Sequence, residues 1–212
     1  MGLEVALGSS LARVRAAQLP RDVARAVPSA PVFTVVAPVA PPRLWSWVAD
    51  GVLKGFEKNL GDAKGGSVLL QRSIGAGALA LSAIQAALVE PHLTLDAQMV
   101  ALSVEGAAAH IAISAGMRVY RARSGEPRRL LNSPQRSPGI SHGGMLVATE
   151  RLQRGDLFVM GSRDAFGMRS IGAVATLLAT RPDAAPAELC EAALGPCRAT
   201  GVGVGLVVLR VR

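Results

Sequence analysis

Short apolar segments separated by glycine- or proline-containing connections occur along most of the chain, and their lengths predict β-strands. About nine such segments are expected to be strands: residues 3–6, 32–37, 44–49, 98–104, 109–114, 118–122, 145–148, 157–160 and 202–211. The connections 38–42 and 115–117 are short enough to join antiparallel neighbours. The segment pairs flanking them, 32–37 with 44–49 and 109–114 with 118–122, are therefore predicted to pair within a sheet.

A second pattern, in which apolar residues recur with a helical period, covers residues 68–89, 171–180 and 186–194. Strands grouped in the middle of the chain, with helices on either side, predict an α+β sandwich of antiparallel sheets. Residues 73–89 carry no charge and form a stretch that is short for a membrane span. We expect a buried core helix there and no membrane span.

A length of 212 residues suits one domain over residues 1–212, and a hydrophobic content of 50% excludes a disordered chain. The role of residues 1–30 stays open. Cys190 and Cys197 match neither a redox motif nor a zinc site, which favours a cytoplasmic location. The net charge of +8 favours acidic or phosphorylated partners, whereas the 3% aromatic content makes nucleic acid an unlikely ligand.

Arginines cluster between residues 118 and 136, opposed only by Glu126. The members expected to bind a phosphate or a partner are Arg118, Arg121, Arg123, Arg128 and Arg129. Arg121 and Arg123 would share one face of a strand. The alternative is that the cluster is only the solvated surface of a hairpin.

Five segments follow one another in an order that matches a known family. They are RLWSWVADG (43–51), AGMRVYRARSGEPRRLL (115–131), SPGI (137–140), LQRGDLFVMGSRDAF (152–166) and GLVVLRV (205–211). This order resembles the PPM (type 2C) metal-dependent serine/threonine phosphatases, in particular the small bacterial subgroup that includes SpoIIE and RsbX. The resemblance covers roughly residues 30–212. It implies an α/β/β/α sandwich with two antiparallel sheets flanked by helices.

The resemblance also implies a site in which aspartates at strand ends hold two divalent cations that activate water. The family's strand ending in "ADG" would supply Asp50 and Gly51 as metal-binding residues. The early carboxylate, 17 residues upstream in the closest subgroup, falls on Phe33. The "tDG" aspartate falls on Arg163, with Asp164 one position further on, and the terminal acidic pair falls on Val202 and Gly203.

Asp50 matches its signature, and Asp164 lies one position away from the expected aspartate. Two carboxylates cannot offset the four positive charges of two divalent cations. With these departures, the resemblance therefore implies a catalytically impaired, regulatory pseudophosphatase that binds a protein partner, a phosphoprotein being one candidate, and needs no cofactor. The first alternative is a divergent protein phosphatase that uses Asp50, Asp164 and Asp156 with manganese or magnesium. The weaker alternative is a nucleic-acid-binding module that uses the arginine cluster.

This interpretation carries a geometric expectation. Phe33, Arg163, Val202 and Gly203 should lie around Asp50, because the resemblance places each at a strand end lining the former site. A base, Arg163 or Lys54, should then pair with the Asp50 carboxylate, since a buried unpaired charge is costly.

Overall fold

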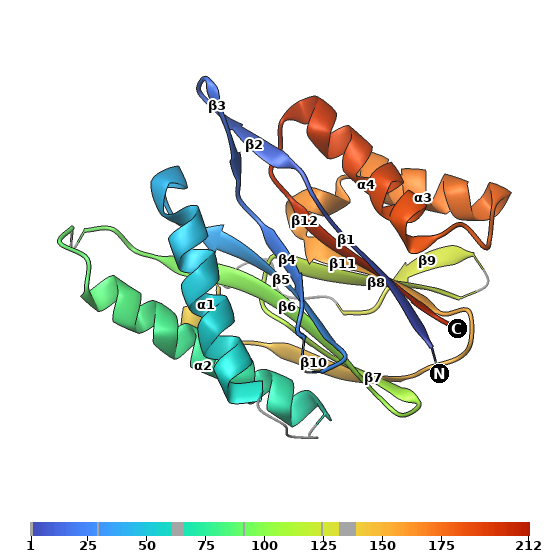
Figure 1. Ribbon diagram of the computed structural model, residues 1–212, viewed down its shortest axis with the longest axis horizontal. Coiled ribbons are helices and arrows are strands. Elements are labelled where there is room, and N and C mark those ends of the chain that lie inside the picture. Colours follow the sequence, from blue (N-terminus) through green and yellow to red (C-terminus); the bar gives the residue numbers. More distant parts are fainter. Residues whose placement is uncertain (1, 29, 61–65, 91, 124, 132–138) are drawn as a thin grey trace.

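Two antiparallel sheets pack face to face, with a pair of helices outside each (Figure 1). The computed structural model describes residues 2–28, 30–60, 66–90, 92–123, 125–131 and 139–212. All strand pairs in these ranges are antiparallel. The predicted α+β sandwich is therefore confirmed.

The first sheet contains both ends of the described chain. Its strand order is β1 (Leu3–Ser9), β12 (Gly205–Val211), β11 (Leu157–Ser162), β8 (Met117–Arg123) and β9 (Glu126–Arg129). Helices α3 (Met168–Thr180) and α4 (Pro186–Thr200) cover its outer face. The 3-10 helix η3 (Arg163–Phe166) joins β11 to α3, so the end of β11 lies close to the start of this helix layer.

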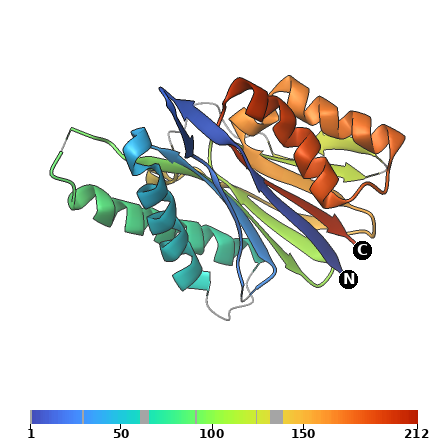
Figure 2. The ribbon, with the colours of Figure 1, turned by 45° about the horizontal axis from the view of Figure 1, so that its top comes forward.

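The second sheet has the order β10 (Leu146–Arg151), β7 (Ala108–Ile113), β6 (Asp96–Glu105), β5 (Val32–Val39) and β4 (Val23–Ala26). Helices α1 (Trp45–Leu60) and α2 (Gly66–Ala86) cover its outer face (Figure 2). Two 3-10 helices, η1 (Pro42–Leu44) and η2 (Ile140–His142), lie in its connections. A separate hairpin, β2 (Leu11–Val14) with β3 (Ala17–Pro20), extends from the sandwich between β1 and β4.

The space between the sheets is filled by apolar side chains from both of them. Phe158 and Leu209 come from the first sheet, and Phe33, Leu102 and Ile111 come from the second. β5 is buried from Val32 to Pro38, since α1 covers its other face. Burial on both faces explains why this strand is apolar apart from Thr34 and does not alternate.

The prediction of a strand over residues 44–49 is wrong. The chain forms η1 and then α1 over this segment, and Val48, Val52 and Phe56 are buried at helical spacing against the second sheet. The predicted pairing of 32–37 with 44–49 is wrong for the same reason. Instead, β5 pairs with β4 and β6.

The prediction that the connection 115–117 joins two neighbouring strands of one sheet is wrong. This connection crosses from the second sheet to the first. β7 pairs with β6 and β10, whereas β8 pairs with β11 and β9. Gly116 turns the chain with a φ of +78°, and a Cβ atom there would overlap the Gln98 side chain. A short glycine-containing connection fits a hairpin and a sheet crossing equally well, so length alone could not distinguish them.

The described residues between 2 and 28 contribute two strands, β1 and β4, to the sandwich. β1 pairs with β12 along its whole length, and β4 pairs with β5. The sequence predicts β1 but not β2, β3, β4 or β9. These four strands are only four residues long and carry arginine, glutamine or proline.

Helix α2 is long and apolar enough to cross a membrane by length and composition, and 28% of that window is buried inside the structure. Its buried side chains, including Leu70, Ile74 and Leu81, pack against α1 and the second sheet. The expected helix is thus present, but it is buried along one face only and is not the buried core helix that was expected, since Leu79 lies on its exposed side.

Glycines set the distance between α1 and α2, and this makes a matched pair of substitutions informative. A Cβ atom at Gly55 would lie 2.7 Å from the Ala76 carbonyl oxygen and 2.8 Å from the Ala80 Cβ, whereas one at Gly75 would meet nothing within 4 Å. We expect Gly55→Ala to lower the free energy of unfolding by about 2 kcal/mol. Gly75→Ala should raise it by up to about 1 kcal/mol. Equal effects in urea unfolding would contradict this packing.

Candidate anion-binding pocket

A pocket of about 700 Å³ opens at the end of the sandwich where β11 ends and β12 begins. Its wall is formed by segments far apart in the sequence, namely β2, the start of α1, the start of β8, η3 and the connection from α4 to β12. Four arginines line it: Arg13, Arg21, Arg118 and Arg163. Trp45, Asp164, Phe166, Val202 and Gly203 complete most of the remaining wall.

The Arg21 guanidinium joins two carboxylates at this pocket. Its Nε donates to Asp22 Oδ1 at 2.7 Å, and its Nη1 donates to Asp164 Oδ2 at 2.8 Å. A second bond runs from Nη2 to Asp22 Oδ2 at 3.3 Å. The planar guanidinium is suited to such a bridge because its five N–H donors have fixed directions.

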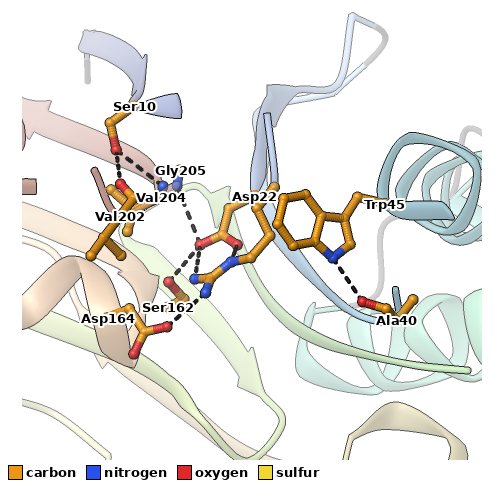
Figure 3. A network of polar contacts seen from close by, with 10 residues as sticks. Ser10, Asp22, Ala40, Trp45, Ser162, Asp164, Val202, Val204 and Gly205 are labelled. Carbon is orange, nitrogen blue, oxygen red and sulfur yellow. Dashed lines mark hydrogen bonds and ion pairs between the residues drawn. The ribbon is translucent and has the colours of Figure 1, made fainter. Parts of the chain in front are cut away.

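Asp22 is buried beside Arg21, outside the lining of the pocket, and it ties the two sheets together. Its Oδ2 accepts the Ser162 hydroxyl at 2.5 Å and the Gly205 N–H at 3.4 Å, so β4, β11 and β12 meet at this carboxylate (Figure 3). Burial raises the pKa of Asp22 above its ordinary value, although the bonds from Arg21, Ser162 and Gly205 oppose the shift. Ser10 fixes the neighbouring backbone through bonds to Val202 and Val204.

The structure brings together some of the residues that the resemblance placed at the site. Arg163, Asp164, Val202 and Gly203 all line the pocket. Phe33 does not, because its side chain packs in the apolar layer between the sheets.

Asp50 and Gly51 are not part of this pocket. Both lie inside α1 and not at a strand end, since residues 45–60 form that helix. Gly51 packs against Ile84 of α2, which gives it a structural reason to be glycine. Asp50 is exposed and forms no ion pair with any residue that the structure describes. The expected pairing of Asp50 with Arg163 or Lys54 is therefore wrong.

The strand that precedes the first helix is β5, and it ends at Val39. The position that the resemblance gives to the "ADG" signature thus corresponds to the end of β5, where Pro38, Val39 and Ala40 provide no carboxylate. The same 17-residue spacing, counted back from Val39, falls on Asp22 instead of Phe33. Sequence reasoning missed Arg21 and Asp22 because it aligned the signature with residues inside a helix.

The arginines of the predicted cluster do not form one common surface, because they contact different partners. Arg121 and Arg123 share a face, as predicted, but Arg121 pairs with Glu150 and Arg123 forms two bonds of 2.8 Å with Asp156. The Arg129 Nε donates to the Leu131 carbonyl oxygen at 3.0 Å, and Arg128 is exposed on β9. Only Arg118 of this group reaches the pocket, where its Nη1 donates to the Phe166 carbonyl oxygen at 3.5 Å.

Within the described ranges, no three acidic, histidine or cysteine side chains gather as a metal-binding group. The carboxylate in the pocket wall is Asp164, and it already binds the Arg21 cation, as does the adjacent buried Asp22. Divalent cations would have to lie beside four arginines. The described residues therefore do not fit a pair of Mn²⁺ or Mg²⁺ ions. Asp156 cannot join Asp164, since the two flank opposite ends of β11, about 20 Å apart.

No family model and no curated protein matches the sequence of this chain. Solved structures do match its fold. The catalytic domain of the serine/threonine protein phosphatase PstP, in complex with two manganese ions, superposes with a TM-score of 0.79 at 17% identity, covering 99% of each chain.

Two further structures belong to the same fold class. PppA, a regulatory component of T6SS in Pseudomonas aeruginosa, matches with a TM-score of 0.80 at 15% identity over 99% of this chain and 98% of its own. The phosphatase domain of SpoIIE from Bacillus subtilis matches at 0.56 and 15% over 98% and 92%. The chain thus has the fold of PPM-type serine/threonine phosphatases.

Proposed function

We propose that this chain is a catalytically impaired PPM-fold protein that regulates by binding a protein partner. The observation that carries the proposal is the Arg21 bridge between Asp22 and Asp164. A protein cation there neutralises the two carboxylates that would otherwise be available to metal ions.

The alternatives lack comparable support. A single-metal phosphatase that used Asp50, Asp164 and Asp156 would need three side chains that lie on α1 and at opposite ends of β11. A nucleic-acid-binding surface would need an exposed basic patch. Glu150 and Asp156 instead neutralise two of the arginines that were expected to form it.

The proposal predicts that manganese or magnesium supports no turnover of p-nitrophenyl phosphate above background. Calorimetric titration with either cation should show no heat of binding. Asp22→Asn and Asp164→Asn should leave the background rate unchanged, as should Asp50→Asn, which alters an exposed helix position. Manganese-dependent turnover that disappears in Asp164→Asn but survives in Asp50→Asn would contradict the proposal. A PPM phosphatase with bound manganese, such as the PstP catalytic domain, is the positive control.

A further inference from the structure

A buried carboxylate faces an exposed histidine at the start of β6. Asp96 is 3% exposed, and its Oδ1 accepts the N–H groups of Ala97 at 2.7 Å and Ser141 at 3.2 Å. Its Oδ2 accepts no hydrogen bond from the described residues. Among these residues, the basic atom within 4 Å of this oxygen is Nδ1 of His142, at 3.4 Å, and 59% of the His142 side chain is exposed. One oxygen of a buried carboxylate therefore faces a group that can gain a positive charge.

Glycines flank the short element that carries His142. η2 lies between Gly139 and the pair Gly143–Gly144, whose φ values are +70° and +79°. A Cβ atom at Gly139 would overlap the Asp96 carboxylate, so the chain approaches Asp96 closely there. η2 is also anchored by Ile140, which is 3% exposed in the core between the second sheet and its helices. Because glycine adopts many backbone conformations without strain, η2 can move while the chain on either side stays in place.

From this arrangement we infer that His142 and Asp96 form a pH-sensitive clamp, which holds η2 against β6 more tightly when the imidazole is protonated than when it is neutral. Histidine is the side chain whose charge changes between pH 5 and pH 8. A charged imidazole neutralises the buried carboxylate and supplies a donor to its Oδ2, whereas a neutral imidazole leaves that charge without a cation. The inference is independent of the proposed function, since neither residue lines the pocket.

The elements packed against η2 supply no competing carboxylate within 4 Å among the residues described. η2 packs mainly against α2 and β6. The other charged or titratable residues of these elements and of the connection between them are Arg72, Glu90, His92 and Glu105. Arg72 is exposed on α2, and Glu90 lies 3.9 Å from His92. Glu105 lies at the far end of β6, about 30 Å from Asp96 along the strand. The charge of Asp96 is therefore the one that responds to the protonation of His142.

Hydrogen exchange measured by NMR at about pH 5.5 and about pH 7.5 tests the clamp through the Ser141 amide, which donates to Asp96. Protection factors correct each rate for the intrinsic effect of pH. The Val100 amide, inside β6 between β5 and β7, is the reference for global unfolding. We expect the protection of Ser141 relative to Val100 to be about fivefold higher at the lower pH, because a charge-assisted hydrogen bond forms at a partly exposed site.

Variants assign this difference to the pair. His142→Gln keeps a polar side chain but cannot gain a charge, so it should remove most of the difference. Asp96→Asn should remove it as well, because the buried acceptor is no longer charged. His92→Gln is the matched control: it replaces a histidine that lies beside the exposed carboxylate of Glu90, and it should leave the difference unchanged. Circular dichroism checks that each variant is folded.

Three results would overturn the inference. They are equal relative protection of Ser141 at both pH values, an unchanged difference in His142→Gln, and a loss of the difference in His92→Gln. Because His142 is exposed, its substitution tests the clamp even if the buried substitution Asp96→Asn prevents folding.

Discussion

Replacing Phe158 by alanine should lower the free energy of unfolding by about 4 kcal/mol, the largest effect of any substitution considered. Phe158 is 1% exposed on β11 and lies in the apolar layer between the sheets. Its neighbours there include Phe33, Leu102 and Leu209. Both sheets are rigid and hydrogen-bonded, so they cannot close around the lost ring.

Thermal unfolding would show this loss as a decrease in Tm of roughly 12 °C for a chain of this size. Phe158→Leu keeps most of the volume and should cost less than about 1.5 kcal/mol. Leu7→Ala, at a position 45% exposed on β1, is the matched apolar control and should stay within about 0.5 kcal/mol. A Phe158→Ala loss as small as that of Leu7→Ala would mean that the sheets do not pack through this ring.

Among the strands that the sequence predicted correctly, those buried on both faces carry the strongest local signal. β5, β6, β11 and β12 lie under helices on one side and against the other sheet on the other, so each contains an apolar run of at least four residues. The short β2, β3, β4 and β9 lack that signal. Their positions follow from pairing with longer neighbours or with each other, which no local pattern records.

Helix α1 shows why a short window misleads. Residues 44–49 contain two tryptophans and a valine, a composition that favours a strand. The helical period becomes visible only when Val48, Val52 and Phe56 are considered together. Because the family's signature was aligned with this segment, the error also moved the expected site from the end of β5 to the middle of a helix.

The pocket was partly predictable. Arg163, Asp164, Val202 and Gly203 were placed together by the resemblance, since they follow β11 and precede β12. Arg21 and Asp22 could not be placed without the fold. Asp22 bonds to Ser162, which lies 140 residues further along the chain. A signal that would have identified Asp22 is its spacing from the end of β5, once that strand is recognised as the one before the first helix.

Arg21→Ala is expected to lower the free energy of unfolding by about 3 kcal/mol, because it leaves the buried Asp22 carboxylate without its cation. Asp22 is fully buried, and Arg21 retains only 21% of its side-chain exposure. Arg21→Lys keeps the charge but cannot bridge both carboxylates, so it should recover only part of the loss. Asp22→Asn combined with Arg21→Ala should be more stable than Arg21→Ala alone, since no buried charge remains unpaired.

The pH dependence provides an independent measurement of the same interaction. Burial raises the pKa of Asp22 above its ordinary value of 3.8, so the folded state takes up a proton more readily than the unfolded chain. The contribution of this protonation of Asp22 to the free energy of unfolding is fully present below about pH 4. It is lost as the pH rises through the higher pKa of the folded state. Without Arg21 the pKa of Asp22 should rise further, because the bonds that lower it are gone.

We therefore expect urea unfolding of Arg21→Ala to show stability that decreases from pH 4 to pH 8 more steeply than that of the unsubstituted protein. The double variant with Asp22→Asn should remove this added slope, because the titrating carboxyl is absent. Arg25→Ala, which breaks the more exposed pair with Glu57, is the control and should change neither the slope nor the stability by more than about 0.5 kcal/mol. An Arg21→Ala profile parallel to that of the unsubstituted protein would show that Arg21 does not neutralise the buried Asp22 carboxylate.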